Sequence, residues 1–339
     1  MKLFLSALAI AAFVTGSTGF AQPAAPLKLV AKYKMPANIT GRFDHLTADP
    51  GSNRLLVTAE TAHEVLVFDL RSGDYLRALS GIGIPHAIFF RDDLNRIYIT
   101  DGGAGALRIY DGKTYQQIST IKLKVDSDSV GYDPTTHDLY VVNGGGDANE
   151  PFSMLSVVNT TSDEKVAEIK IDGDTLEAMA LARSTPLLYI NNPAKNQVGI
   201  VNRKTHSVVG TWSIKMGEKN VAMALDPSSH RLFVACRSGV LVVVDSSTGK
   251  ELQSLPIGKG VDDLIFDSSS KRIYAACGGG EGSIAAYHED DPNHYTSLGQ
   301  VPSAPGGKNE TIVPQMQRLF VTIPPHGAAP GEVFVYRVL

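Results

Sequence analysis

The amino-acid sequence predicts an all-β fold, a seven-bladed β-propeller whose blades are four-stranded antiparallel sheets. Three observations lead to this prediction. A strand-like pattern recurs seven times with a period of about 44 residues, which is typical of propeller blades. A second strand-like pattern follows every copy of the first. No long stretch has the 3.6-residue apolar period of an amphipathic helix, so we expect few helices.

The first pattern places an aromatic residue or a leucine after a pair that often combines Arg with Leu or Ile, and small or β-branched residues follow it. The aromatic or leucine positions, which we call the anchors, are Leu56, Tyr98, Tyr140, Tyr189, Phe233, Tyr274 and Phe320. Their spacings are 42, 42, 49, 44, 41 and 46 residues. We interpret each anchor as the centre of strand b, the second strand of its blade.

The second pattern is a short run of β-branched residues that ends in a turn. The runs are residues 65–69, 107–111, 155–159, 198–202, 241–245, 284–288 and 333–337. We interpret each run as strand c. Strand a then precedes each anchor, as at residues 45–49 and 263–267, and strand d follows strand c, as at residues 208–214 and 252–257.

The seventh repeat ends at Leu339 before any strand d, whereas an unassigned strand-like segment, residues 27–33, precedes the first strand a. We predict that this segment pairs beside residues 333–337 and supplies the missing strand. The N-terminal strand would thereby close the ring and leave no free sheet edge between the first and last blades.

The N-terminus is typical of a secretory signal peptide. Lys2 precedes an apolar run at residues 3–14, and the small residues Gly19 and Ala21 fit cleavage after residue 21. A run of about 12 apolar residues is shorter than the about 20 needed to span a bilayer, so we expect no membrane anchor. We expect residues 1–21 to be removed and residues 22–339 to form one monomeric propeller domain that is periplasmic or secreted.

Composition and motifs argue against several functions. The 31 Lys and Arg and 35 Asp and Glu residues give a net charge of −4, and no run of basic residues occurs. We expect no nucleic-acid partner, because phosphate binding requires clustered basic side chains. The sequence contains no Gly-x-Ser-x-Gly and no Cys-x-x-Cys-His motif, which argues against a hydrolase nucleophile elbow and against covalent haem.

The repeats and three further motifs resemble the YVTN-repeat, YncE-like family of exported bacterial seven-bladed propellers. The motifs are Gly41-Arg42-Phe43-Asp44-His45-Leu46, Val261-Asp262-Asp263-Leu264 and Ala304-Pro305-Gly306. The resemblance extends over essentially all of residues 22–339 and implies the propeller fold and export. It implies no particular reaction, because the family has no agreed activity and a fold does not determine a function.

One face of the expected disc carries irregular loops. The a–b and c–d turns are short, whereas the d–a and b–c loops are irregular, and three b–c loops, at residues 101–105, 143–147 and 278–282, are rich in glycine. Function concentrates in irregular loops on a rigid scaffold. We therefore place the site on the face of the d–a and b–c loops, where the d–a loops lead into strand a and the central channel.

Aligning the blades on their anchors gives one column of residues at the channel entrance. The column is Asp44, His86, Asp128, Glu177, Val221, Asp262 and Lys308. Six of its seven members are ionisable. With the polar neighbours of the column, the predicted binding residues are Asp44, His45, His86, Asp128, Glu177, Asn220, Asp262, Asp263, Asn309 and Glu310.

Three kinds of site are consistent with these residues. A zinc-like metal would suit a set of imidazoles and carboxylates comprising His45, His86, Asp128, Glu177 and Asp262. Calcium would suit an oxygen-only set comprising Asp128, Glu177, Asp262 and Asp263. The reading we favour is a polar pocket without metal or other cofactor, which binds a small molecule or a protein.

The predicted function is therefore an exported binding module with a polar site at its channel mouth. The alternative is a lactonase-like or metal-dependent hydrolase acting at the same place, and the sequence does not decide between a binding protein and an enzyme. The segment 288–294 has metal-ligand residue types, but its position at a c–d turn on the opposite face favours a solvated turn.

The two cysteines, Cys236 and Cys277, each follow their anchor by three residues and so occupy equivalent positions in neighbouring blades. Equivalent strand b positions lie about 9 Å apart, whereas a disulfide requires Cα atoms within about 7 Å. We expect two free, buried thiols although exported proteins often form disulfides.

Overall fold

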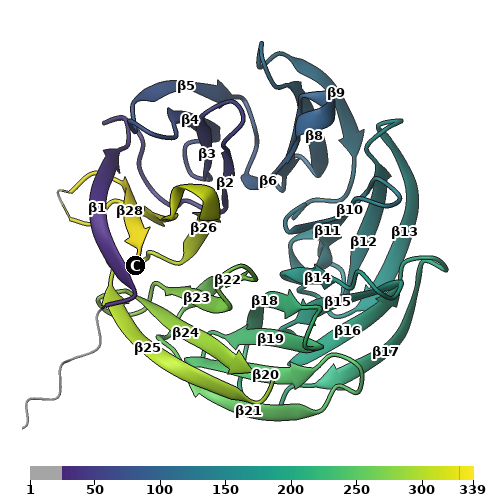
Figure 1. Ribbon diagram of the computed structural model, residues 1–339. Coiled ribbons are helices and arrows are strands. Elements are labelled where there is room, and N and C mark those ends of the chain that lie inside the picture. Colours follow the sequence, from purple (N-terminus) through teal and green to yellow (C-terminus); the bar gives the residue numbers. More distant parts are fainter. Residues whose placement is uncertain (1–24, 328) are drawn as a thin grey trace, which may run out of the picture.

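The computed structural model describes residues 25–327 and 329–339, so the predicted signal peptide at residues 1–21 lies outside the described part. The described chain forms 28 strands in seven four-stranded antiparallel sheets, arranged as the blades of a ring around a central channel (Figure 1). This confirms the seven-bladed propeller. Within residues 25–327 and 329–339, no helix has the length and apolar character needed to cross a membrane.

The four strands of each blade run from the channel to the rim (Figure 1). The innermost strands, a, are β2 (Leu46–Asp49), β6 (Pro85–Arg91), β10 (Val130–Asp133), β14 (Met179–Leu181), β18 (Asn220–Asp226), β22 (Val261–Asp267) and β26 (Asn309–Val313). Strands b are β3 (Arg54–Ala59), β7 (Arg96–Asp101), β11 (Asp138–Gly144), β15 (Leu187–Asn192), β19 (Arg231–Cys236), β23 (Arg272–Cys277) and β27 (Arg318–Ile323).

The two outer positions complete each blade. Strands c are β4 (Glu64–Asp69), β8 (Ala106–Asp111), β12 (Phe152–Asn159), β16 (Gln197–Asn202), β20 (Val240–Asp245), β24 (Ser283–Asp291) and β28 (Glu332–Val338). Strands d are β5 (Tyr75–Ser80), β9 (Gln117–Lys122), β13 (Glu164–Asp172), β17 (Ser207–Ser213), β21 (Glu251–Pro256), β25 (His294–Pro302) and, for blade 7, β1 (Leu27–Lys34).

Burial across a blade explains why the two anchor patterns are the strongest signals in the sequence. Strands b and c lie between neighbouring blades and are covered on both faces, so β3 is buried at all six positions and β4 at its four central ones. The outer strand β5 is mostly exposed. A strand covered on both faces reads as a continuous apolar run, whereas a rim strand needs few apolar residues.

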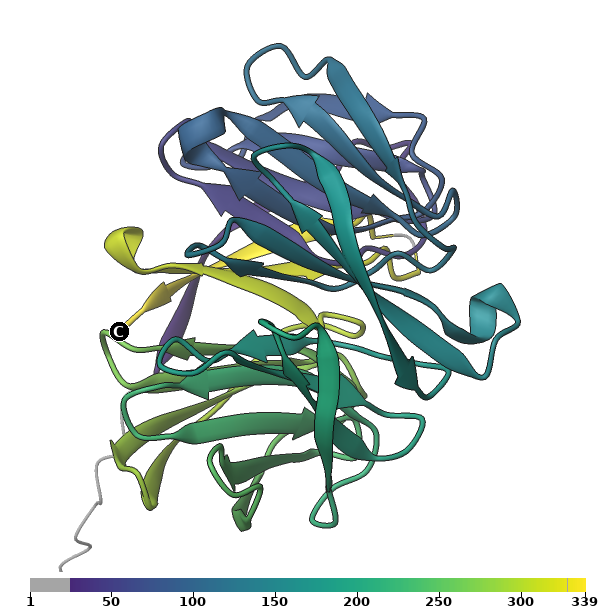
Figure 2. The same ribbon diagram turned by 90° about the vertical axis from the view of Figure 1, so that its right-hand side faces the viewer.

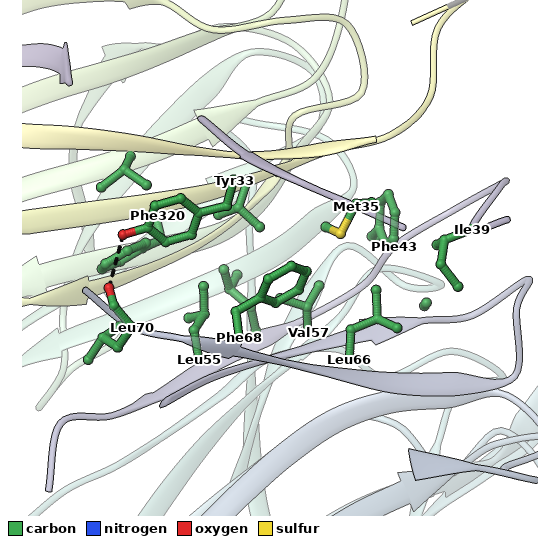
Figure 3. Packing of buried hydrophobic residues seen from close by; sticks show 14 of the residues in the cluster. Tyr33, Met35, Ile39, Phe43, Leu55, Val57, Leu66, Phe68, Leu70 and Phe320 are labelled. Carbon is green, nitrogen blue, oxygen red and sulfur yellow. Dashed lines mark hydrogen bonds between the residues drawn. The ribbon is translucent and has the colours of Figure 1, made fainter. Parts of the chain in front are cut away.

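The N-terminal strand closes the ring as predicted. Strand β1 pairs antiparallel with β28 from Leu27 opposite Val338 to Lys34 opposite Glu332. At the end of β1, Tyr33 is buried in a cluster shared by blades 7 and 1, its ring centroid 6.2 Å from that of Phe320 (Figure 3). Its hydroxyl donates a hydrogen bond of 3.0 Å to the carbonyl of Leu70 in blade 1 (Figure 3).

Tyrosine hydroxyls also join other neighbouring blades. Tyr98 of β7 donates to the carbonyl of Thr160 at 3.0 Å, and Tyr189 of β15 donates to the carbonyl of Ser246 at 2.6 Å. In each case the acceptor follows strand c of the next blade. The anchors Tyr98 and Tyr189 therefore satisfy their buried hydroxyls while their rings pack between blades.

The loops divide between the two faces of the disc as expected. The 3₁₀ turns η1 (Asp92–Leu94) and η3 (Pro314–Met316) belong to a–b turns, and η2 (Gly145–Ala148) belongs to a b–c loop. In the side view, the blue and yellow-green coils of η1 and η3 project from one face and the teal coil of η2 from the other (Figure 2).

A buried carboxylate fixes the loops of blade 2 on the η2 face. Asp101, at the end of β7, is fully buried and accepts hydrogen bonds from the backbone amides of Gly83, Ile84 and Ala104 at 2.9 to 3.0 Å. It also pairs with Arg108 at 2.6 Å. One side chain thereby joins the d–a loop to the b–c loop, which keeps the channel entrance in a defined conformation.

The two cysteines are free and buried, as expected. Cys236 pairs with Asn220 across its sheet, and Cys277 pairs with Val261 at the equivalent position of the next blade. Burial raises the pKa of each thiol to about 12, so both remain protonated at neutral pH.

Candidate functional site

The predicted site residues lie where the innermost strands begin. Asp44 and His45 precede β2, Asp128 precedes β10, and Glu177 precedes β14. The remaining members lie within the first residues of β6, β18, β22 and β26. Neighbouring innermost strands contact one another around the ring (Figure 1), so we place their first residues at one end of the channel.

Several of these strands are irregular where the column residues lie. The pairing register shifts at the start of β6 around His86, at the start of β18 around Val221, and at the start of β22 around Asp262. All three residues belong to the column found by sequence alignment. A bulge adds an unpaired residue to a strand and changes the direction of its side chain, so the same irregularity recurs at the same column position in three blades.

Asp44 lies at the centre of the charged cluster. Its Oδ2 is 2.7 Å from Nδ1 of His86, and its Oδ1 accepts a 3.3 Å hydrogen bond from the amide of Asn309. Nε2 of His45 lies 3.9 Å from Oδ1 of Asp44. Burial by itself raises the pKa of Asp44, but the nearby His45 and His86 outweigh it and hold the pKa well below its usual range.

His45 connects two carboxylates on opposite sides of its ring. Its Nδ1 is 3.1 Å from Oδ1 of Asp263, and its Nε2 is 4.0 Å from Oδ1 of Asp128. Burial lowers the pKa of His45, but the carboxylates of Asp263 and Asp44 outweigh burial and raise it well above its usual range. Oδ1 of Asp128 is buried and has no hydrogen-bond partner.

His86 is held by two acidic groups. Besides Asp44, its Nδ1 faces Oε1 of Glu60 at 3.5 Å. Burial lowers the pKa of His86, but the hydrogen bond to Asp44 and the charge of Asp128 dominate and raise it to about 9. His86 therefore carries its proton at neutral pH and acts as a hydrogen-bond donor.

The other side of the cluster contains two basic side chains. Asp262 forms ion pairs with both Arg237 and Lys308, and Arg237 lies 3.7 Å from Oε1 of Glu177. Burial and the nearby carboxylates of Asp128 and Asp262 raise the pKa of Glu177 to about 8. Burial is also the largest cause that raises the pKa of Asp128, to about 7. The negative charge in this half of the site is therefore reduced in two ways, by protonation of Glu177 and Asp128 and by ion pairs with Arg237 and Lys308.

A small cavity continues from His45 into the channel. It has a volume of about 210 Å³ and is lined by His45, Asp263 and Glu310 together with apolar residues that include Ile88 and Met179. Glu310 is only 5% exposed. One of its oxygens accepts a hydrogen bond from the backbone of Ala276, and Oε2 has no partner. Burial and the neighbouring Asp263 raise the pKa of Glu310 well above its usual range.

A groove of about 400 Å³ opens between blades 2 and 3 at the loop face. His86 lies at this groove, whose lining includes Asp126 and Asp147. Burial, together with the charge of Asp147, raises the pKa of Asp126. A β-carbon at Gly102 would lie 2.8 Å from the ring of His86. The glycine-rich b–c loop of blade 2 therefore leaves room for the imidazole beside the groove.

A larger hollow of about 440 Å³ lies between blades 3 and 4 and is lined by a–b and c–d turn residues, including Arg183, Arg203 and Lys204. It contains none of the predicted site residues. Arg203 is already paired with Asp133 and with two backbone carbonyls. We therefore assign the site to the opposite, loop face, where the ionisable groups converge.

Sequence alignment included one residue that the structure places elsewhere and missed two that belong to the cluster. Asn220 is fully buried and donates hydrogen bonds to Asn191 and to the carbonyl of Gln197, so it links neighbouring blades. Glu60 and Arg237 were missed. Both stand four residues after an anchor. The residues at this position in the seven repeats form a second column, whose other five members are Gly or Pro. Comparing that column would have found them.

Two groups of side chains have the spacing of metal ligands. Asp44, His45 and Asp128 form one group, and Asp44, Glu60 and His86 form the other, with donor atoms within 4.8 Å of one another in each. The oxygen-only set proposed for calcium does not form such a group in the part of the chain that the structure describes. Its member Asp262 is occupied by two cationic partners.

The chain is similar in sequence to three curated proteins, and no protein-family model matches it. It is 30% identical over 99 residues to YncE of Salmonella typhimurium, covering 29% of this chain and 28% of that protein. The corresponding values for YncE of Salmonella typhi are 29% identity over 99 residues, with the same coverage. The seven-bladed β-propeller protein Rv1057 of Mycobacterium tuberculosis is 23% identical over 178 residues, covering 51% of this chain and 45% of that protein. The chain spans less than half the length of each relative.

Two solved structures share the fold. A chain of the Mitotic Checkpoint Complex has a TM-score of 0.72 at 15% identity, with 99% of both chains covered. A chain of hydrazine synthase from Kuenenia stuttgartiensis has a TM-score of 0.72 at 14% identity, with 88% of this chain and 99% of that chain covered. At these identities the similarity establishes the propeller architecture and nothing about activity.

Proposed function

We propose that this chain, a YncE-like seven-bladed β-propeller, is an exported binding module whose ligand carries a small cationic group and docks at the channel mouth. One observation supports this most directly. Every blade contributes an ionisable side chain to a single, largely buried cluster at the loop face. Burying charges costs several kcal/mol per ion unless they are well paired, so stability alone would not select such a cluster.

The sign of the cluster supports a cationic ligand. Four basic side chains belong to it, namely His45, His86, Arg237 and Lys308. Its carboxyl groups are Asp44, Glu60, Asp126, Asp128, Glu177, Asp262, Asp263 and Glu310. Acidic groups therefore outnumber basic ones, and the raised pKa values of Asp128 and Glu177 reflect this excess together with burial. A cation would relieve the excess negative charge.

The groove between blades 2 and 3 supplies an entry of suitable size. Its volume of about 400 Å³ would accept a small molecule or a side chain of a partner protein. Asp126 and Asp147 line the groove, and His86 lies between it and Asp44. A cationic group would meet the two groove carboxylates before reaching the buried cluster.

The experiment is a thermal-shift titration of the purified protein. Putrescine, spermidine and arginine would be the cationic probes, with succinate and glucose as controls. We expect a saturable rise in melting temperature with a cationic probe, and loss of that rise in an Asp126→Asn, Asp147→Asn double variant. Asp172→Asn, on an outer strand, is the matched control. Stabilisation by succinate alone would overturn the cationic assignment, and an equal shift in both variants would locate binding elsewhere.

The alternative is a lactonase-like or metal-dependent hydrolase, and the two ligand groups around Asp44 favour it. His86 does not favour it, because at neutral pH it is protonated and cannot serve as a general base. Hydrolysis of a chromogenic lactone with zinc present, abolished by His45→Gln, would establish the enzyme. Absence of turnover in a zinc-loaded sample would favour the binding module.

A further inference from the structure

We propose that Asp44, His45 and Asp128 bind one divalent transition-metal ion of the zinc class at the channel mouth. This inference rests on the proposed function, since it names a metal cation as a ligand of the same site. Four features of the channel mouth support this site: the spacing of the donor atoms, the orientation of the imidazole, buried oxygens without partners, and an adjacent cavity.

The donor atoms of the three residues lie within 4.8 Å of one another, close to the separations of ligands around one ion. Nε2 of His45 lies 3.9 Å from Oδ1 of Asp44 and 4.0 Å from Oδ1 of Asp128. These separations are too long for direct hydrogen bonds. A tetrahedral ion about 2.0–2.1 Å from each ligand holds ligand atoms about 3.3 to 3.4 Å apart. The separations from Nε2 exceed these by about 0.6 Å, which small rotations of the three side chains around a bound ion would remove.

The imidazole of His45 is oriented as in many metal sites. Its Nδ1 is hydrogen-bonded to Asp263, and Nε2 is directed toward Asp44 and Asp128, where a bound ion would displace the proton of Nε2 into solvent. Asp263 is itself held by the backbone amide of Glu310 at 3.0 Å. A carboxylate on the far nitrogen fixes the tautomer of a ligating histidine and strengthens it as a donor. Asp263 is thus a positioning residue for the proposed ion.

Buried oxygens without partners provide independent support. Oδ1 of Asp128 faces His45 yet accepts no hydrogen bond, although it is buried. Glu310, which is 5% exposed and lines the same cavity as His45, has a buried Oε2 that also lacks a partner. A buried polar atom without a partner costs about 1 to 3 kcal/mol, so the unpartnered Oδ1 of Asp128 beside His45 indicates a missing ligand, and Glu310 offers a further acceptor at the cavity.

The chemistry of the three ligands identifies the class of ion. One imidazole and two carboxylates suit Zn²⁺ and similar ions, whereas calcium prefers six to eight oxygen ligands. Three protein ligands leave at least one coordination position for water or an exchangeable ligand. The cavity of about 210 Å³ beside His45 provides that space.

The neighbouring group of Asp44, Glu60 and His86 is less suitable. Nδ1 of His86 lies 2.7 Å from Asp44, a direct hydrogen bond that leaves no space for an ion between these atoms. The same bond restrains Asp44, as does the amide of Asn309. We therefore assign the ion to His45 and give His86 the role of orienting a ligand carboxylate.

Calorimetric titration with Zn²⁺ of the purified full chain, after chelator treatment and dialysis, tests the assignment. We expect one ion per chain, and affinity weakened at least about 100-fold by His45→Gln or Asp128→Asn. Asp263→Asn should weaken it about 10- to 100-fold while leaving the melting temperature in chelator unchanged. His294→Gln, in the exposed turn where His294 pairs with Asp291, is the matched control and should bind like wild type.

Cobalt substitution keeps the proposal falsifiable if a variant fails to fold. Co²⁺ bound to wild-type protein should show visible bands of nitrogen and oxygen ligation without a thiolate charge-transfer band, since Cys236 and Cys277 are not ligands. A thiolate band, no binding by wild type, or unchanged affinity in His45→Gln would overturn the proposal. Loss of binding in His294→Gln alone would identify a surface site. Zinc binding without any amine-dependent thermal shift would retain the metal site and refute the small-molecule function.

Discussion

Removing the Tyr33 side chain should substantially destabilise the ring at its closure. Tyr33 is 6% exposed, and it packs among buried residues of blades 7 and 1 that include Phe320, Phe68 and Leu55 (Figure 3). Replacing a buried aromatic side chain with alanine typically costs about 3 to 5 kcal/mol. Tyr33→Phe removes only the hydroxyl, which donates to the carbonyls of Leu70 and Arg71, and a cost of about 1 kcal/mol is expected.

Urea unfolding at pH 7, followed by fluorescence and circular dichroism together, would measure both effects. Val30→Ala is the matched control, since Val30 lies on the same strand but is 43% exposed, and we expect a change within about 0.5 kcal/mol. If Tyr33→Ala cost less than about 1 kcal/mol with an unchanged m-value, the N-terminal strand would not be an essential part of blade 7. Loss of coincidence between the two probes would instead indicate that blade 7 opens before the rest of the ring.

Three further results are expected. Asp101→Asn should lower the free energy of unfolding by about 2 to 4 kcal/mol at pH 7, because an amide cannot replace the buried ion pair and all of the amide acceptor bonds. Burial raises the pKa of Asp101, but its hydrogen bonds outweigh burial and lower the pKa overall, so the stability that Asp101 contributes is present above about pH 4 and is lost as the pH falls further. The urea midpoint should therefore fall more steeply between pH 7 and pH 3 in wild type than in the Asp101→Asn variant, and parallel curves would contradict this. Cys236 and Cys277 should be unreactive toward a thiol reagent in the native protein and should give two reactive thiols in denaturant without reductant, whereas none would indicate a disulfide. Gly102→Ala should displace the ring of His86 and abolish any thermal shift caused by cationic probes, while an unchanged shift would separate His86 from the binding site.

The blade pattern could be predicted because it depends on local burial that repeats. Leu56, Tyr98 and Phe233 occupy equivalent positions and are all essentially buried, so the same apolar requirement recurs in each repeat. Closure by the N-terminal strand could also be predicted, since the last repeat lacks a strand and the first is preceded by an extra one. Neither inference needs knowledge of which blades touch across the channel.

The candidate site could be predicted only in part. The alignment identified Asp44, His86 and Asp128 because a shared register brings equivalent residues to the same end of the channel. It did not identify Glu60 and Arg237, because strand a alone was compared and these residues follow strand b. The residues that precede strand a and the residues that follow strand b come together only when strands a and b of each blade pair beside the channel.

The sequence by itself determined the number of blades, the order of strands and the residues that strand a brings to the channel mouth, because these follow from repeated local patterns of burial and turns. Only the tertiary structure decided how the charges pair. Asp262 meets Arg237 and Lys308 from neighbouring blades, whereas Asp128 retains a buried oxygen without a partner. Pairing energies change over a few ångströms in a buried environment, and these separations are set by bulges and blade packing rather than by sequence spacing.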